Sequence, residues 1–314
     1  MRNQASLGHG IPANSWLFVW SKRNANCTAY EDRGCGFICA HCHSAFWAIH
    51  KAAELSTRFI RSPYYSIVIP AYNEERRIGA SLEKILAYTK CQQCETEIII
   101  VNDGSHDDTS EIVRDFAIRN QEIVLLENPG NRGKGYSVRH GMLHARGEIL
   151  LFSDADLSSP IEEADKLFNA LSAGADIAIG SRWVQPSLQT RPQSLRRQLL
   201  GRAFNLVPRF LLGLNYKDTQ CGLKAFKNTV ARTIFPLQKI ERWGFDPELL
   251  FLGLSNGFSV VEVPVAWAHS EGTRIRPLRD GVRMLWEMGR IRWYASTGQY
   301  DLEKNTPVEM TTPA

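Results

Sequence analysis

From residue 64 onwards, short apolar runs rich in β-branched residues alternate with stretches in which apolar residues recur every three or four positions. The first pattern is typical of buried strands and the second of amphipathic helices. The expected strands are Tyr65–Ile69, Glu97–Val101, Ile123–Leu126, Ile149–Phe152 and Ile177–Ile179. The expected helices are residues 77–88, 109–119, 135–145 and 162–173. This alternation predicts an α/β fold with a mostly parallel central sheet flanked by helices.

Beyond Arg182 the alternation weakens, and residues 1–62 show no clean period at all. The later elements that we expect are a basic and apolar segment Leu195–Leu214, a turn at Asp218–Gly222, strands Leu223–Phe226 and Val260–Val265, and helices around Pro247–Leu254 and Asp280–Ser296. We therefore expect three regions: a poorly ordered extension over residues 1–62, one domain over 63–300 and a disordered tail over 301–314.

The charge is ordinary overall but uneven along the chain. The sequence is 44% hydrophobic and 22% charged, with a net charge of +4, which is too small to predict nucleic acid as a partner. Residues 182–224, however, contain eight Lys or Arg residues and one acid, Asp218. This local excess predicts a polyanion or an anionic membrane surface as the partner of that segment.

Seven cysteines, an odd number without the spacing of a secreted framework, predict reduced thiols in a cytoplasmic protein. We expect no signal peptide and no transmembrane helix, because no apolar run is long enough for either. If the protein meets a membrane, we expect it to lie on the cytoplasmic face.

The spacing Cys35-x3-Cys39-x2-Cys42, with Cys27, His41 and His43 nearby, is similar to that of radical-SAM iron–sulfur ligands. Such enzymes need a large barrel after the motif, and a different fold follows here. A structural zinc is a second reading. Disorder of the extension, or a start codon placed too early, is the reading that we favour.

Two acids one residue apart, Asp154 and Asp156, follow the expected strand Ile149–Phe152. In extended backbone, residues i and i+2 point the same way, so both carboxylates can reach one point. Carboxylate oxygens suit Mg²⁺ or Mn²⁺, which proteins often hold with one or two carboxylates and the substrate's phosphates. The alternative is a helix N-cap, because Asp156 and Ser158 precede an expected helix.

Three other expected strands also end in polar or glycine-rich segments, at residues 70–74, 102–105 and 128–135. Parallel sheets bind ligands beyond the carboxyl ends of their strands. Asp103 can accept hydrogen bonds from a nucleoside, and the third segment offers backbone N–H groups and Lys134 at a helix start, where phosphate binds well. Its glycine spacing fits neither a Walker loop nor the dinucleotide fingerprint.

The order of these motifs over residues 64–300 resembles the family 2 glycosyltransferases, and most closely the branch of dolichyl-phosphate β-glucosyltransferases and polyprenyl-phosphate mannosyltransferases. The motifs DTQCGLKAF, FDPELL and VEVPVAW look more like the glucosyl enzymes, and DADLSSP looks more like the mannosyl enzymes. Transfer of glucose from UDP-glucose is therefore favoured, with mannose from GDP-mannose as the alternative.

The resemblance implies a GT-A fold and an inverting transfer from a nucleotide-sugar donor. The donor-binding positions that match the family's motifs are Pro70, Tyr72, Glu74, Asp103, Lys134 and Asp154. Asp154 and Asp156 match the metal-binding pair for Mg²⁺ or Mn²⁺, with Asp156 the expected direct ligand.

The acceptor implied by the resemblance is a polyprenyl or dolichyl phosphate. Arg182 and Arg196 match the arginines that hold its phosphate, although a solvated helix face is the alternative for both and more so for Arg196. Asp218 matches an acid near the acceptor, which either orients the sugar or caps a turn. The residues expected to be catalytic are thus Asp156, Arg182 and Asp218. A phosphate monoester is largely dianionic at neutral pH and attacks without a strong general base.

Residues 195–214 and 282–294 mix Arg with Leu, Trp, Phe and Met, which suits helices lying on a membrane surface; the alternative is amphipathic helices that cover the sheet. Other functions also remain open. They are transfer to a non-lipid glycan, a non-catalytic protein that binds sugar nucleotides, and a nucleotidyltransferase, which would show a glycine-rich loop after its first strand.

Overall fold

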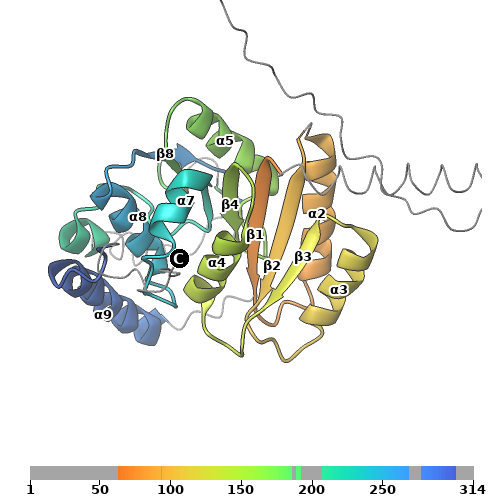
Figure 1. Cartoon of the computed structure of the whole chain (residues 1–314), viewed down its shortest axis with the longest axis horizontal. Coiled ribbons are helices and arrows are strands. Elements are labelled where there is room, and N and C mark those ends of the chain that lie inside the picture. The colour runs from red at the N-terminus through yellow and green to blue at the C-terminus, as the bar shows by residue number, and fades with distance from the viewer. Residues whose placement is uncertain (1–62, 93, 186–188, 192–206, 269–276, 302–314) are drawn as a thin grey trace, which may run out of the picture. The chain divides into compact units, whose positions relative to one another are not determined.

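The computed structural model describes residues 63–92, 94–185, 189–191, 207–268 and 277–301 (Figure 1). The chain divides into two units, Met1–Arg58 and Phe59–Ala314, and every described residue belongs to the second. The expected N-terminal extension with its Cys and His residues, Arg196 and the expected tail beyond residue 301 lie outside the described residues.

A seven-stranded sheet with the order β3-β2-β1-β4-β7-β5-β8 forms the centre of the second unit (Figure 1). Its strands are β1 (Tyr65–Ala71), β2 (Thr96–Asn102), β3 (Ile123–Glu127), β4 (Ile149–Ser153), β5 (Ile177–Ser181), β7 (Leu223–Lys227) and β8 (Val260–Pro264). All neighbouring strands are parallel except β7, which runs antiparallel to both β4 and β5. The expected mostly parallel sheet is confirmed.

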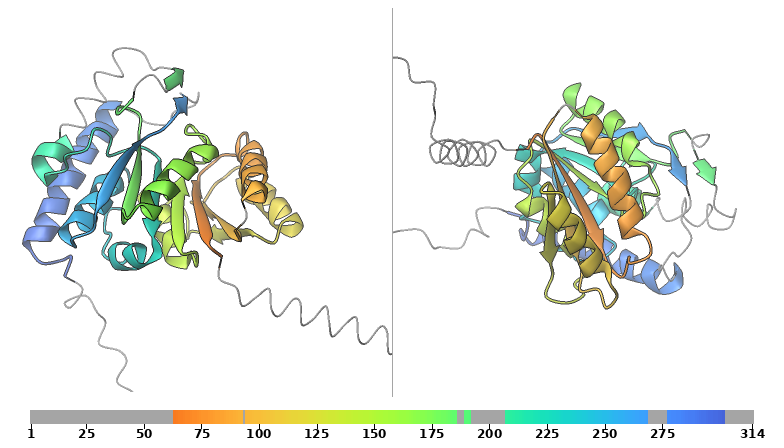
Figure 2. Two further views of the ribbon diagram at one scale, coloured as in Figure 1. Left: turned by 90° about the horizontal axis from the view of Figure 1, so that it is seen from above. Right: turned by 90° about the vertical axis from the view of Figure 1, so that its right-hand side faces the viewer.

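Helices cover both faces of the sheet (Figure 2). One face carries α2 (Ile78–Cys91), α3 (Thr109–Arg119), the 3-10 helix η1 (Ile161–Glu163) and α5 (Ala164–Ser172). The other carries α4 (Lys134–His144), α7 (Asn228–Ile234), α8 (Phe245–Ser255) and α9 (Pro277–Ser296).

The two hydrophobic cores explain the sequence pattern of the central strands. In β1, Ile67 and Ile69 join the core under α2, whereas Val68 between them joins the core under α4. Since successive side chains of a strand point to opposite faces, a strand buried on both faces needs apolar residues at every position. This is why these strands appear as continuous apolar runs.

Three elements were not predicted: α7 and the short parallel pair β6 (Gln189–Arg191) and β9 (Trp267–Ala268). Strands of two or three residues are too short to show a period. The helix expected over 162–173 is divided, because a 3-10 turn precedes α5.

The sheet brings the polar strand ends together. The carboxyl ends of β1, β2, β4 and β5 lie at one edge, because these strands are parallel within the sheet. Since β7 is antiparallel, its amino end lies at the same edge, and Ser153 of β4 pairs with Leu223 of β7. The residues just after Ser153 and just before Leu223 are therefore neighbours. In the part of the chain that is described, no helix is both long and apolar enough to cross a membrane.

Candidate active site

Asp154 and Asp156 lie in a tight turn directly after β4. The N–H of Leu157 donates to the carbonyl of Asp154 (3.1 Å), and Leu157 has a positive φ of 46°. The Asp156 carboxylate accepts the N–H of Ser158 at 3.0 Å. The next helix begins at Ile161, and its N-cap position is not Asp156, so the alternative of a helix cap is wrong. Asp156 closes the local turn instead.

Lys134, the first residue of α4, holds the Asp154 carboxylate, with 2.5 Å between Nζ and Oδ1. The same nitrogen lies 5.3, 5.7 and 5.8 Å from the ring centroids of Phe152, Trp243 and Phe245. Burial lowers the pKa of Lys134, but the nearby carboxylates of Asp154 and Asp246 outweigh it and raise the pKa overall. A cation is thus built into the site beside the predicted metal ligands.

The residues fit a divalent cation of the kind that the resemblance implies. Asp154 and Asp156 keep 36% and 24% of their side chains exposed, so a ligand can reach them. A Cβ on Gly222 would lie 1.9 Å from Oδ2 of Asp154, so only glycine leaves room for this carboxylate. Among the described residues, no group of three or more His, Cys, Asp or Glu side chains could hold a metal. Two carboxylates completed by donor phosphates and water are the coordination that Mg²⁺ commonly takes in nucleotide sites.

Arg77 links the nucleotide motif to the aspartate pair and was not predicted. Its guanidinium lies 2.6 Å from the Glu74 carboxylate and 3.9 Å from that of Asp156. Nearby, the hydroxyl of Ser81 donates to the carbonyl of Ala155 at 2.6 Å. The start of α2 is therefore bound to the turn after β4, and the predicted donor residue Glu74 lies on the metal side of the site.

The loops after β1 and β2 are bound to each other near the predicted nucleotide residues. Asn73, with a positive φ of 51°, donates its N–H to the Ser105 hydroxyl (2.8 Å) and accepts the N–H of His106 (2.8 Å). Pro70 lies in β1 and Tyr72 just beyond it. These two residues therefore stand at the edge of the sheet where Asp154 and Asp156 lie.

Asp103 follows β2 directly, and its buried carboxylate organises the glycine-rich loop. It accepts the backbone N–H groups of Arg132 (2.9 Å) and Gly133 (2.8 Å) and the side-chain amide of Asn128 (2.9 Å). The structure thus gives Asp103 a loop-holding role that the sequence pattern did not indicate. Its contact with a nucleobase stays a prediction.

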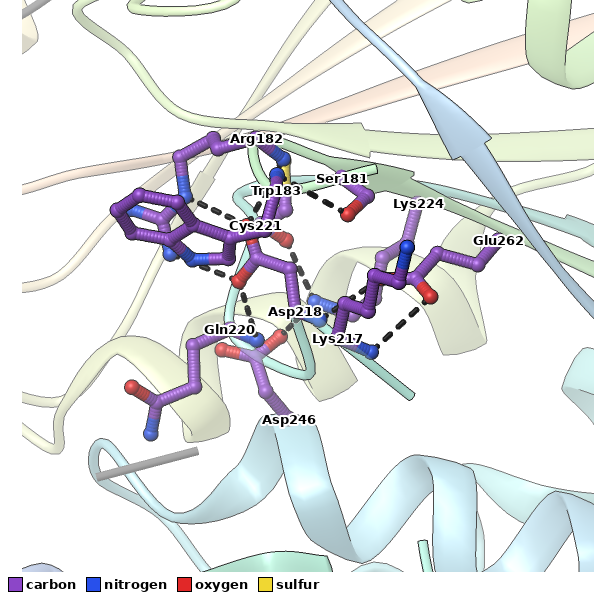
Figure 3. A network of polar contacts seen from close by, with 10 residues as sticks. All are labelled: Ser181, Arg182, Trp183, Lys217, Asp218, Gln220, Cys221, Lys224, Asp246 and Glu262. Atoms are coloured by element: carbon purple, nitrogen blue, oxygen red, sulfur yellow. Dashed lines mark hydrogen bonds and ion pairs between the residues drawn. The ribbon is translucent and has the colours of Figure 1, made fainter. Parts of the chain in front are cut away.

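Arg182 follows β5 and forms a forked ion pair with Asp218 (Figure 3). Nε and Nη2 of Arg182 donate to Oδ2 and Oδ1 of Asp218 at 2.6 and 2.8 Å, and the Arg182 backbone N–H donates to Oδ2 at 3.0 Å. Asp218 is fully buried and also accepts the N–H of Gln220 at 3.3 Å. Burial raises its pKa, but Arg182 outweighs this and lowers the pKa overall, so Asp218 stays ionised.

This geometry favours one of the two roles left open for Asp218. Both of its oxygens are engaged by Arg182 and by the turn at Gln220, which favours closing the turn over orienting the sugar. It closes the turn and sets the plane of the Arg182 guanidinium, which also lies 5.6 Å over the Trp267 ring. A direct catalytic contact of Asp218 stays a prediction.

A buried ion pair between Lys224 of β7 and Asp246 of α8 was also missed. Lys224 Nζ lies 2.6 Å from Oδ1 of Asp246 and 2.5 Å from the carbonyl of Cys221. Burial raises the pKa of Asp246. The available signal was a lysine inside an apolar strand and an acid in the first turn of a helix. Both residues lie in motifs quoted above for the family resemblance, DTQCGLKAF and FDPELL, but the sequence does not show that they pair.

The chain is similar to curated enzymes over most of its length. Residues 66–235 match the family described as Glycosyl transferase family 2. The chain is 36% identical to the dolichyl-phosphate beta-glucosyltransferase of Drosophila melanogaster, over 70% of this chain and 71% of that protein. It is 31% identical to the human protein of the same name, over 76% and 78%.

The fold is similar to that of a solved glycosyltransferase. The crystal structure of glucosyl-3-phosphoglycerate synthase from Mycobacterium tuberculosis in complex with Mg²⁺ and UDP matches with a TM-score of 0.55 at 20% identity, over 78% of this chain and 83% of that one. The expected GT-A fold is thereby confirmed. With its family match, its relatives and this fold, the chain belongs to glycosyltransferase family 2.

Proposed function

We propose that the chain transfers glucose, with inversion, from UDP-glucose to dolichyl phosphate or another polyprenyl phosphate at the cytoplasmic face of a membrane. The observation that carries this proposal is that two charged groups lie at one edge of the sheet: the aspartate pair with Lys134, and Arg182 with Asp218. The relatives, which bear the name of glucosyltransferases, support glucose over mannose.

On the donor side, Asp154 and Asp156 would hold the divalent cation, Mg²⁺ or Mn²⁺, which neutralises the charge that develops on the leaving diphosphate. Lys134 adds a second cation at the amino end of α4, where backbone N–H groups favour phosphate. Asp103 keeps the preceding loop in place through the N–H groups of Arg132 and Gly133. Pro70, Tyr72 and Glu74, at the end of β1 and just beyond it, would hold the nucleoside.

On the acceptor side, a lipid monophosphate has a second pKa of about 6 and is mostly dianionic at neutral pH. One of its oxygens can attack the anomeric carbon without giving up a proton, so the site needs a positioned cation more than a general base. Arg182 is suited to this role because Asp218 and Trp267 fix its orientation. Arg196 is the second predicted phosphate ligand.

Helix α9 supports contact with a membrane surface. Val282, Trp286 and Trp293 are 68%, 61% and 55% exposed and share one face of the helix, while Met288 and Ile291 on another face are buried in the core. Apolar and tryptophan side chains next to arginines are typical of interfacial helices. Covering the sheet and facing a lipid surface are thus compatible roles for α9.

The test is a transfer assay with UDP-glucose and a short polyprenyl phosphate. We expect Asp154→Asn and Asp156→Asn to lower kcat about a hundredfold or more. Each substitution weakens the binding of a cation that would stabilise the transition state by several kcal/mol. Asp115→Asn, an exposed acid on α3, is the control. Full turnover by either variant at an unchanged melting temperature would overturn the proposal. Product with a glycan but not with the lipid phosphate would point to the other acceptor class.

The choice of donor can be tested by thermal shift with Mn²⁺. At a hundredfold excess over its Kd, a ligand adds about 2.7 kcal/mol of stability, or roughly 5–10 °C for a domain of this size. We expect this shift with UDP and little with GDP. A larger shift with GDP would support GDP-mannose as the donor.

A further inference from the structure

Glu262 of β8 binds the loop that carries Asp218 (Figure 3). It lies in the motif VEVPVAW, but the sequence suggested no role for it. Its Oε1 accepts the backbone N–H of Asp218 at 2.7 Å, and its Oε2 accepts that of Lys217 at 3.0 Å. Two successive N–H groups thus point at one carboxylate. Hydrogen bonds to an ionised acceptor are stronger than those between neutral groups, so this pairing fixes the start of the loop firmly.

The next link runs from Asp218 to Arg182. The carboxylate of Asp218 accepts three hydrogen bonds from Arg182, at 2.6, 2.8 and 3.0 Å. Arg182 directly follows β5, and β5 pairs in parallel with β8, where Ile179 lies opposite Glu262. Glu262 therefore lies in β8 and Arg182 directly after the neighbouring strand β5, and Asp218 in the loop contacts both.

We propose that Glu262 is a positioning residue for the acceptor phosphate, acting on Arg182 through Asp218. The proposal rests on the proposed function, in which Arg182 holds that phosphate. Without Glu262, the N–H groups of Lys217 and Asp218 lose their acceptor, the loop shifts, and the guanidinium loses its fixed plane.

The other end of the same loop has a separate attachment. Lys224 holds the carbonyl of Cys221 and the carboxylate of Asp246, and Gly222 lies against Asp154 on the metal side. A change at Glu262 should therefore disturb the acceptor end of the loop and leave the donor end in place. This separates a positioning role from general structural support, which would affect both ends.

The decisive variant is Glu262→Gln. Glutamine offers one oxygen and one NH₂ group to two N–H donors, so one hydrogen bond is lost and a donor faces a donor. We expect the KM for polyprenyl phosphate to rise about tenfold, which corresponds to a loss of about 1.4 kcal/mol. We expect the KM for UDP-glucose and the thermal shift with UDP and Mn²⁺ to stay within error. Glu262→Asp keeps both oxygens and should restore part of the acceptor KM.

A double-mutant cycle tests the path. In an Arg182→Lys background the forked ion pair with Asp218 is already lost. Glu262→Gln should then add less than a twofold change in acceptor KM. A full tenfold further rise, or an equal rise of the donor KM in the single variant, would overturn the inference. If Glu262→Gln does not fold, Glu262→Asp takes its place in the cycle with the same criteria.

Asp176→Asn is the matched control. Asp176 also accepts a backbone N–H, that of Ser259 at 3.0 Å, and pairs with Lys227, but it does so at the opposite ends of β5 and β8. The substitution Asp176→Asn should lower the melting temperature without changing the acceptor KM. If the unmodified protein makes no product from polyprenyl phosphate, the proposed function fails. If it does and Glu262→Gln leaves the acceptor KM unchanged, only this inference fails.

Discussion

At Gly222 the loop before β7 passes so close to Asp154 that the smallest side chain would overlap with the carboxylate. The Cβ of an alanine would lie 1.9 Å from Oδ2 and 2.4 Å from Cγ of Asp154. Either the carboxylate or the loop must then move, and the carboxylate is the flexible partner. The position of a predicted metal ligand thus depends on the absence of a side chain in the loop before β7.

We predict that Gly222→Ala lowers kcat about ten- to a hundredfold, because displacing a reacting group by about 1 Å can cost that much. The Mn²⁺ concentration needed for half-maximal activity should rise, as a titration of transfer activity against Mn²⁺ would show. Gly289→Ala is the control, since an added Cβ there meets nothing within 4 Å. It should leave activity unchanged and stabilise α9 by about 0.5–1 kcal/mol. Wild-type Mn²⁺ dependence in Gly222→Ala would contradict the prediction.

The single residues that the sequence could identify are those placed by strand ends and by the family resemblance, such as Asp154, Lys134 and Arg182. Their partners could not be identified in the same way. Glu262 meets Asp218 across 44 positions of the chain, and Lys224 meets Asp246 across 22. A sequence pattern shows which residues are polar, but only the fold shows which of them touch.

At the scale of elements, helix α9 has one face that packs against the core and one that is exposed to solvent. Its inner face joins the core through Met288 and Ile291, and the buried Glu287 accepts the N–H of Gly244 at the start of α8 (2.8 Å). Its outer face carries the exposed Val282, Trp286 and Trp293. Substitutions on the outer face should therefore change surface contacts without changing the fold.

We predict that the double variant Trp286→Ser, Trp293→Ser floats less with vesicles containing anionic lipid, by about tenfold or more, because it removes two exposed aromatic side chains that would enter the lipid surface. Its melting temperature should stay within about 2 °C, since surface substitutions usually change stability by no more than about 0.5 kcal/mol. Ile118→Ser, an 81% exposed apolar position on α3, should float like the unmodified chain. Equal flotation of all three proteins would argue against α9 as the membrane-facing element.

The type of an element was predictable where its burial leaves a clear sequence pattern. This holds for helices with one face buried over several turns and for strands with both faces buried over several residues. The direction of β7 was not, because alternation with period two is the same for parallel and antiparallel strands. Nor did the sequence separate the two faces of α9, since Trp286 outside and Met288 inside are both apolar. Helix α7, with seven residues, was too short to stand out.

At the scale of the whole molecule, Glu248 of α8 joins the segment just before α8 to the residues that follow α9. Its carboxylate accepts the N–H groups of Lys239 and Ile240 (both 2.9 Å) and the hydroxyl of Tyr300 (2.7 Å). Burial raises its pKa from the ordinary 4.5 to about 7, although these hydrogen bonds act in the opposite direction. The folded protein therefore keeps a proton on Glu248 at pH values where the unfolded chain has released it.

This difference sets the sign of a pH effect. Because the native state binds the extra proton between pH 4.5 and about 7, Glu248 makes the free energy of unfolding fall as the pH rises through that range. We predict that in Glu248→Gln the loss of stability from pH 5 to pH 8 is smaller, by on the order of 3 kcal/mol. Urea unfolding at both pH values measures it, with Glu111→Gln, an exposed acid on α3, as control. The same slope in all three proteins would contradict the prediction.

The antiparallel strand β7 has one more consequence. The pairing of Ser153 with Leu223 places Gly222 beside Asp154 whatever the chain does between β5 and β7. The strand register therefore fixes the distance between the two loops that meet at the predicted cation site. Under the proposed function, changes in the length or sequence of the stretch between β5 and β7 would alter the acceptor side and leave the spacing of Asp154 and Gly222 unchanged.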